Sequence, residues 1–424
     1  MIDKIKYFMF NEKYQKMISN FSYLTLINIV NKLLPLIVIP YIVHVIGVGK
    51  FGIITFAWAL ISFFILVTQY SFLLTATKYI SQYRDDIIKI SQHFWLVLSV
   101  RFIIFLLILI VFIFLLFTVE RFYTQKEVFL FTFLALFADI IMPLWFFRGI
   151  EEMKYIAIFN IIAKIVYTFS IFLFITQETD YVWIPLLNSL ALLMVNFYAL
   201  YFSISRFKIQ FILPTWDEIK NTFIEGKDIF LSNMSVALYT TVNIILLGFL
   251  TNYTIVGIYS LAESLFSAYN GIIKTYTMVV YPHLAKYTNS LETMYTQARK
   301  FFLLYLSILT IGAIFLFLIS GFVIRLLYGE GHDTSIEILR ILAFSLLFEP
   351  LGGFFTAYLS LKSEYKVIRS ITFKTMLLNL VLVVPMILLF EAKGTAYLFI
   401  LLSLVQVYLN LKHNREIISF RWSK

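Results

Sequence analysis

The sequence contains no cysteine and has few charged residues for its length. Without cysteine, a disulfide scaffold, a zinc finger, a thiolate nucleophile and an iron–sulfur cluster are all excluded. Charged residues make up 14% of the 424 residues, against about a quarter in an average soluble chain. Apolar residues reach 61%, and the mean hydropathy is +0.88. This composition excludes an ordinary water-soluble fold.

The sequence also lacks the motifs of common catalytic sites. It has no Walker A sequence, no Rossmann glycine fingerprint and no Gly-x-Ser-x-Gly. No two histidines stand at metal-ligand spacing; they are His44, His93, His283, His332 and His413. We therefore expect no ATPase motor of its own, no cofactor and no bound metal, which favours a protein that is not an enzyme.

Long apolar runs separated by charge clusters recur along the whole chain. About 20 apolar residues suffice to cross a bilayer as a helix, and the runs predict an all-α polytopic membrane protein with about twelve transmembrane helices. The predicted spans are 19–46, 52–77, 94–118, 128–147, 156–176, 182–204, 228–250, 255–282, 301–324, 336–361, 371–390 and 395–411.

Lys and Arg determine the predicted orientation, because positively charged loops stay in the cytoplasm. If the N-terminus is inside, inside segments hold 23 of the 34 Lys and Arg residues and outside segments hold five. Both termini are therefore predicted to be cytoplasmic. The net charge of +10 follows from this loop bias, so we do not expect nucleic acid as a partner.

The spans divide into two lobes of six helices. We predict a cytoplasmic N-terminal segment (1–18) that is not a cleaved signal, a first lobe (19–204), a cytoplasmic linker (205–227), a second lobe (228–411) and a cytoplasmic tail (412–424). Thr215 and Glu218 have capping-box spacing and predict a short interfacial helix in the linker. Gly52-Ile53 and Gly257-Ile258 begin corresponding spans of the two lobes, which is a faint sign of an internal repeat.

Polar residues form stripes on some spans, although a charge inside a membrane is costly. In the span 19–46, Asn28, Asn31 and Lys32 occupy one face, and Lys32 lies too deep for easy snorkelling. Asn160 and Lys164 form a shorter stripe on 156–176. Such stripes either hold helices together by hydrogen bonds or line a polar cavity.

Two longer stripes lie in the second lobe. Glu263, Ser267, Asn270 and Lys274 share a face of the span 255–282, and Ser345 and Glu349 begin another on 336–361, where Pro350 predicts a kink. Glu263 and Lys274 are about 16 Å apart along a helix, too far for a direct ion pair, so each needs another partner.

Lysines outnumber the carboxylates in these stripes, and the sequence therefore predicts a central cationic cavity that suits an anionic substrate. The candidate substrate-binding residues are Lys32, Asn28, Asn31, Lys164, Asn270, Lys274 and Arg101. The candidates for coupling transport to a proton or cation are Glu263, Glu349 and Asp139. For Arg101, snorkelling to the headgroups is an equally good interpretation.

The first 105 residues contain a more specific pattern. It reads Pro35-x4-Pro40-Tyr41-x5-Gly47-x3-Phe51-Gly52, followed by Lys78-Tyr79-Ile80 and Arg84-Asp85. This pattern resembles the O-antigen and capsule repeat-unit flippases, the polysaccharide-transport branch of the multidrug/oligosaccharidyl-lipid/polysaccharide exporter superfamily. Length, helix number and topology are similar over the whole chain. The family commonly has Arg where this chain has His44.

The resemblance implies two six-helix bundles that move an undecaprenyl-pyrophosphate-linked oligosaccharide repeat unit from the cytoplasmic to the periplasmic leaflet of a bacterial inner membrane. It adds Arg84 to the candidate substrate-binding residues and makes a polysaccharide polymerase a candidate partner. Two alternatives remain. One is another transporter of the superfamily, such as a multidrug antiporter or the peptidoglycan-precursor flippase. The other is a membrane polysaccharide polymerase or ligase, which the short predicted outside loops disfavour.

Overall fold

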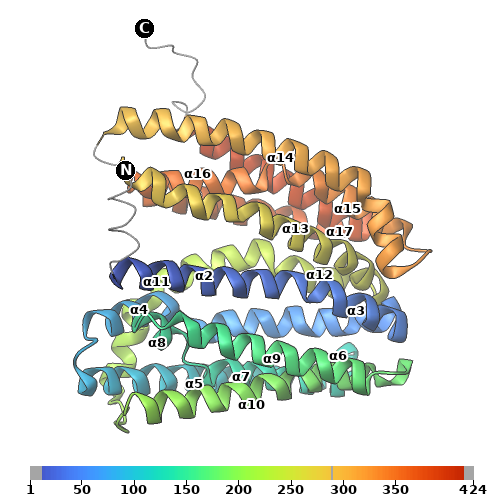
Figure 1. Cartoon of the computed structure of the whole chain (residues 1–424). Coiled ribbons are helices and arrows are strands. Elements are labelled where there is room, and N and C mark those ends of the chain that lie inside the picture. Colours follow the sequence, from blue (N-terminus) through green and yellow to red (C-terminus); the bar gives the residue numbers. More distant parts are fainter. Residues whose placement is uncertain (1–11, 288–289, 415–424) are drawn as a thin grey trace. The chain divides into compact units, whose positions relative to one another are not determined.

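The computed structural model describes residues 12–287 and 290–414 (Figure 1), and these residues contain helices and no strand. The all-α fold class is therefore confirmed. The predicted N-terminal segment and tail lie mostly outside the described residues. The chain folds into two compact units: unit 1 comprises residues 1–34 and 57–234, and unit 2 comprises residues 35–56 and 235–424.

Unit 1 is built around α5, α7, α9 and α10, which run side by side (Figure 1). The helix α2 packs on α9, and α4 packs on the short α8. The elements are α2 (Glu12–Leu33), α4 (Phe72–Gln82), α5 (Ile87–Thr118), α6 (Glu120–Thr124), α7 (Lys126–Ile141), α8 (Leu144–Gly149), α9 (Met153–Phe174), η1 (Glu178–Val182) and α10 (Trp183–Arg206).

Unit 2 is a second helical bundle in which α15 and α16 pack between α13 and α17. Its elements are α12 (Val242–Leu250), α13 (Tyr253–Ala285), α14 (Leu291–Tyr328), α15 (Asp333–Ser345), α16 (Glu349–Leu361) and α17 (Tyr365–His413). Two further helices, α3 (Pro35–Gln69) and α11 (Trp216–Thr240), each contribute residues to both units. The predicted first lobe, 19–204, therefore differs from unit 1, which lacks residues 35–56.

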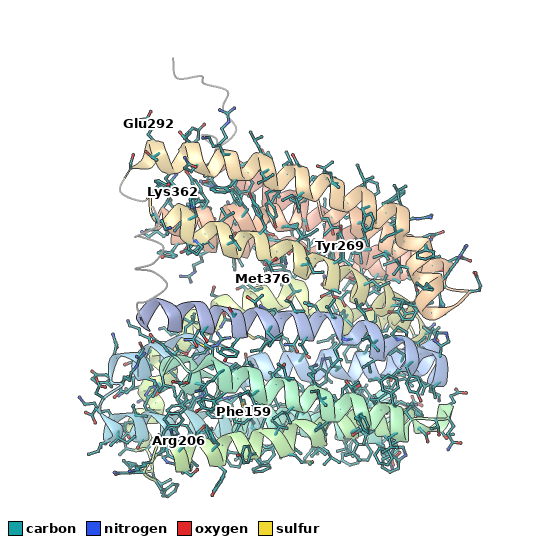
Figure 2. All side chains as sticks on the ribbon, viewed as in Figure 1. Phe159, Arg206, Tyr269, Glu292, Lys362 and Met376 are labelled. Carbon is teal, nitrogen blue, oxygen red and sulfur yellow. The ribbon has the colours of Figure 1, made fainter. Side chains whose placement is uncertain are left out.

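Both units bury aromatic side chains and expose large apolar ones. In unit 1, Trp145 and Phe159 are buried, whereas Phe169 on α9 is 74% exposed; Figure 2 labels Phe159. Exposure of such residues along a helix is costly in water and favourable in hydrocarbon. Together with the apolar length of the helices, this identifies a multi-pass membrane protein.

Among the described residues, eight helical runs are long and apolar enough to cross a membrane, or nine if the bent pair α11 and α12 forms one span. Two of these runs, 25–82 and 365–413, each cover two predicted spans. The helix α13 is long enough but too polar to be among the eight, because it carries the stripe from Glu263 to Lys274. The number of twelve spans stays a prediction.

Helix breaks occur where local chemistry requires them. Gly47 interrupts α3 with φ 73° and ψ 164°, a conformation that glycine adopts without a Cβ penalty. The kink predicted at Pro350 is a break, because proline at the start of α16 lacks an N–H and disfavours helix before it. The predicted span 336–361 is thus two helices, α15 and α16.

Two glycines bring α3 and α13 into close contact within unit 2. A Cβ on Gly52 would lie 1.7 Å from the carbonyl oxygen of Tyr253, and a Cβ on Gly257 would lie 2.3 Å from that of Val48. Both distances are far below van der Waals contact, so only glycine fits at either position. The two glycines that suggested an internal repeat therefore meet at one helix crossing.

The linker helix is longer than predicted. The capping box is present: the hydroxyl of Thr215 accepts from the N–H of Glu218 (3.3 Å), and the Glu218 carboxylate accepts from the N–H of Thr215 (2.7 Å). The helix α11 then continues to Thr240, since Gly226 packs against Tyr70 and does not end it. The Phe223 carbonyl accepts a hydrogen bond from the Tyr70 hydroxyl. The first part of α11 therefore packs against Tyr70 within unit 1.

Candidate substrate and coupling sites

Three predicted site residues of unit 2 meet at one carboxylate. Glu349 accepts a hydrogen bond from Lys274 Nζ at 2.5 Å through Oε1 and one from Asn270 Nδ2 at 3.0 Å through Oε2. Lys274 and Asn270 lie one turn apart on α13, as their stripe predicts, and α13 packs on α16. The Glu349 carboxylate is thus the partner that Lys274 lacks on its own helix.

The geometry of the break positions Glu349. Because Pro350 lacks an N–H and disfavours helix before it, the chain turns over 346–348, and Glu349 stands at the start of α16. The Lys274 side chain is 43% exposed and that of Glu349 is 21% exposed, so the pair is open on one side. One turn further along α16, a Cβ on Gly353 would meet no atom within 4 Å. Space therefore adjoins the pair.

In unit 1, the two predicted polar stripes lie on α2 and α9, and these two helices pack against each other. Lys164 is half-buried on α9 and has no hydrogen-bond or ion-pair partner among the described residues. Asn31 and Asn160 each bury an amide oxygen without a partner there. Lys32 is half-buried and Asn28 is exposed on α2. Unmatched polar atoms inside a bundle indicate a place where a ligand or water is expected.

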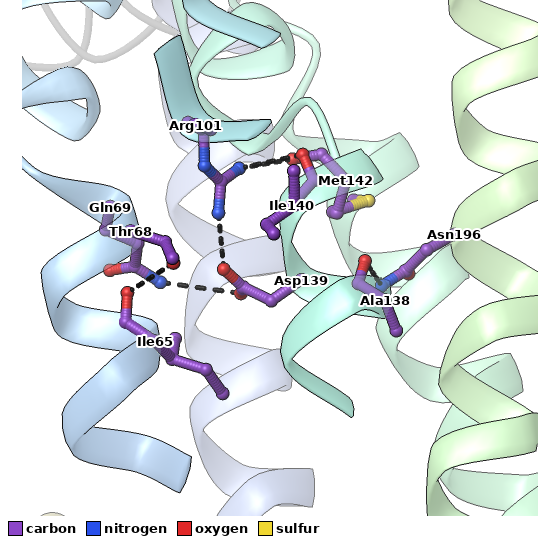
Figure 3. A network of polar contacts seen from close by, with 9 residues as sticks. All are labelled: Ile65, Thr68, Gln69, Arg101, Ala138, Asp139, Ile140, Met142 and Asn196. Atoms are coloured by element: carbon purple, nitrogen blue, oxygen red, sulfur yellow. Dashed lines mark hydrogen bonds and ion pairs between the residues drawn. The ribbon is translucent and has the colours of Figure 1, made fainter. Parts of the chain in front are cut away.

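The buried Arg101 forms an ion pair with the half-buried Asp139 in unit 1 (Figure 3). The Arg101 side chain also donates to the carbonyl oxygens of Ile140 (3.2 Å) and Met142 (3.4 Å), and Gln69 donates to Asp139 at 3.5 Å. Arg101 is only 3% exposed, so its side chain does not snorkel. The candidate substrate residue and the candidate coupling residue thus neutralise each other.

Arg84 lies in the loop between α4 and α5 and bonds a neighbouring loop of unit 1. It pairs with Glu151 at 3.0 Å and donates to the Gly149 carbonyl at 3.4 Å. Two residues later, Asp86 caps α5 by accepting from the N–H of Lys89 (3.1 Å). This hydrogen bond lowers the pKa of Asp86. The segment from Arg84 to Lys89 is therefore held by local contacts.

The chain is similar to known proteins over most of its length. The family described as polysaccharide biosynthesis protein matches residues 17–288, more than half of the chain. The chain belongs to this family. A protein of Escherichia coli (strain K12) named "Putative O-antigen transporter" is 27% identical over 386 residues, which cover 89% of this chain and 91% of that protein. A Shigella dysenteriae protein of the same name is 24% identical over 270 residues, 63% and 67% of the two chains.

Solved structures show which fold this polysaccharide biosynthesis protein has. A multidrug resistance MATE family transporter of the MOP superfamily, in an inward-facing conformation, matches with a TM-score of 0.67 at 14% identity, covering 92% of this chain and 93% of the other. The lipid II flippase MurJ, in an inward closed conformation, matches with a TM-score of 0.63 at 15% identity, covering 88% and 87%. The family is therefore confirmed by the sequence match, and the fold is that of these two solved transporters.

The family match includes most of the predicted site residues but ends before Glu349. Within it, His44 stands where the resembling flippases commonly have Arg, and its Nδ1 lies 2.8 Å from the Pro40 carbonyl of its own helix. Among the described residues, no three His, Asp or Glu side chains are grouped so that they could hold a metal ion.

Sequence reasoning missed an aromatic cluster of this family member in unit 1. The rings of Tyr79 and His93 stack at 4.0 Å, and Trp145 meets His93 edge-on at 6.4 Å. The three residues come from α4, α5 and α8, so no spacing along the chain could reveal the cluster. Only Tyr79 could have been singled out from the sequence, because it belongs to the Lys78-Tyr79-Ile80 pattern.

Proposed function

We propose that this protein is a flippase of the bacterial inner membrane. It moves an undecaprenyl-pyrophosphate-linked oligosaccharide repeat unit from the cytoplasmic to the periplasmic leaflet by alternating access, with both of its own termini in the cytoplasm. The family, the relatives named as O-antigen transporters and the fold shared with MurJ support transport of a polysaccharide precursor. A polysaccharide polymerase that uses the flipped repeat unit is a proposed partner.

The unpartnered Lys164 carries the proposal. An ammonium group that is half-buried on α9 has lost part of its hydration, and no carboxylate among the described residues compensates it. Lys32 contributes a second cation from α2, which packs on α9. A pyrophosphate carries negative charge on several oxygens that accept hydrogen bonds from ammonium and amide groups. Lys164, Lys32, Asn31 and Asn160 offer donors of both kinds.

The test compares two lysines of α9. Lys164→Ala should lose most surface-polysaccharide export in cells that lack another flippase, whereas Lys164→Arg keeps the charge and should keep substantial export. The matched control is Lys154→Ala, because Lys154 begins the same helix, pairs with Glu152 at 3.6 Å and lies at the surface. Full export by the Lys164→Ala variant at normal protein levels would remove Lys164 from the mechanism.

We further propose that Lys274 exchanges partners during transport. In the structure its ammonium contacts Glu349, and an incoming pyrophosphate would compete for the same ammonium. Glu349, released from Lys274 but still beside Asn270, could then accept a proton or cation, and Glu263 offers a second carboxylate on α13. Glu349→Gln keeps the shape of the side chain and weakens its hold on Lys274, so substrate should bind more tightly and turn over more slowly.

The measurement for this step is uptake of a fluorescent lipid-linked oligosaccharide by reconstituted vesicles, with binding measured separately on the purified protein. Opposite changes in affinity and in turnover are expected for Glu349→Gln. Lys274→Met should instead weaken binding. Parallel losses of affinity and turnover in both variants would contradict the exchange and leave the pair as a contact between α13 and α16.

A further inference from the structure

A long groove runs between α14 and α15 within unit 2. Its outer section, the one nearer the connection between α14 and α15, has a volume of about 830 Å³ and a mixed lining. Its inner section, further from that connection, has a volume of about 290 Å³ and an almost wholly apolar lining. The outer section includes Arg325, Asp333, Glu337 and Arg340. None of these residues belongs to the proposed transport site.

The two sections are continuous. Leu318 lines both, and the guanidinium of Arg340 lies over the ring of Phe317 with 5.6 Å to the ring centroid. The apolar inner section of the groove therefore ends at the Arg340 guanidinium. The groove also faces the surroundings of unit 2, since Leu318 is 71% exposed. In a multi-pass membrane protein, an exposed apolar helix face of this kind is covered by lipid chains.

Arg340 differs from the neighbouring cations in having no carboxylate partner. Its Nε donates to Ser320 Oγ at 3.1 Å, and no carboxylate lies within ion-pair distance in the part of the chain that the structure describes. Arg325, by contrast, pairs with Glu330 at 3.3 Å and with Asp333 at 3.4 Å. The positive charge of Arg340 is thus available to an anion from outside the chain.

The groups follow a definite order along α15. From the inner end outward, Phe344, Arg340, Glu337 and Asp333 succeed one another about one turn apart, which gives the order apolar, cation, carboxylate, carboxylate. Glu337 contacts Lys393 through Oε2 and Asp333 contacts Arg325 through Oδ1. Their side chains are 53% and 76% exposed, so each carboxylate keeps room for a further donor.

We propose that this groove binds a membrane phospholipid whose headgroup carries a primary ammonium. An acyl chain lies in the apolar section, the phosphate contacts Arg340, and the ammonium points to Glu337 and Asp333. The order of chemical groups along such a lipid is the order along α15. A headgroup of zero net charge also matches the groove, in which two arginines stand against two carboxylates.

The experiment measures lipid retained by the full-length protein in detergent, using native mass spectrometry with equal additions of three phospholipids. Phosphatidylethanolamine should be retained most. Phosphatidylcholine lacks N–H donors, phosphatidylglycerol lacks an ammonium, and both should bind less. Arg340→Gln should lower retention of all three by about tenfold, as expected for loss of a charged hydrogen bond.

Two further comparisons separate the parts of the site. The double variant Asp333→Asn, Glu337→Gln should lower phosphatidylethanolamine retention to the level of phosphatidylcholine. Lys126→Gln is the matched control, because Lys126 is an exposed cation at a helix end of unit 1, and it should change nothing. The comparison among lipids on the unaltered protein tests the proposal even if a variant fails to fold.

Two results would overturn the proposal. Stronger retention of phosphatidylglycerol than of phosphatidylethanolamine would exclude the ammonium contact. Equal competition by glycerophosphoethanolamine, which has the headgroup but no chains, would identify a phosphate site that needs no lipid. The outcome is independent of the flippase proposal, because no residue of the groove takes part in the proposed transport steps.

Discussion

Removing the carboxylate of Asp139 should destabilise unit 1 strongly. The Arg101 guanidinium is almost fully buried, and Asp139 is its anionic partner among the described residues. In Asp139→Asn the cation stays inside the bundle without a counter-charge, beside a neutral amide and the carbonyl oxygens of Ile140 and Met142. Arg101 Nε already has no hydrogen-bond partner among the described residues, and the neutral amide does not replace the lost negative charge.

The magnitude follows from the cost of a buried charge whose partner is lost, about 3–5 kcal/mol. A loss of about 3 kcal/mol lowers the folded-to-unfolded ratio by roughly a hundredfold. The double variant Arg101→Leu, Asp139→Leu removes both charges, and burying apolar groups there should recover most of the loss. The single changes Arg101→Leu and Asp139→Leu are therefore expected to be strongly non-additive, with a coupling of about 2 kcal/mol or more.

The assay is a double-mutant cycle on the free energy of unfolding, measured by denaturant titration in mixed micelles. Transport by the double variant, normalised to folded protein, then tests whether the pair serves structure alone. Additive single changes, or a cost below about 1 kcal/mol for Asp139→Asn, would refute the reasoning, because they would mean that water reaches the Arg101 guanidinium.

Three further predictions address topology, packing and coupling. A reporter fused after Arg206 should read cytoplasmic and one near Arg121 periplasmic, and the reverse result would overturn the orientation derived from loop charges. Gly52→Ala should cost about 1–3 kcal/mol in thermal or denaturant unfolding, because its Cβ would overlap the Tyr253 carbonyl, whereas Gly353→Ala meets no atom and should be tolerated. Glu263→Gln should abolish any dependence of vesicle transport on external pH, and an unchanged pH response would leave Glu263 as packing only.

The sequence predicted features that depend on spacing within one helix. The stripe on α13 placed Asn270 and Lys274 on one face, and the capping box placed the start of α11. The carboxylate that meets Lys274 lies 75 residues further along the chain, and no periodicity specifies such a pairing. The depth of Arg101 was equally undetermined, because its interior position depends on Asp139 and on two carbonyls freed where α7 ends.

The division into two compact units depends on contacts of the same kind. Charge clusters mark where the chain leaves the membrane, but they do not say which bundle a span joins. Residues 35–56 belong to unit 2 because Gly52 and Gly257 permit a close helix crossing. The short Gly-Ile matches that hinted at a repeat contained this contact, yet only the structure shows that the two glycines touch.

The crossing of α3 and α13 also has a consequence for synthesis of the chain. A ribosome that adds about 5–20 residues per second needs roughly 10–40 s to make the segment between Gly52 and Gly257. During that time α13, the helix that packs against Gly52, has not been made, while the residues of unit 1 emerge up to Met234. Unit 1 can therefore assemble first, and unit 2 completes its fold around a segment that entered the membrane near the beginning of translation.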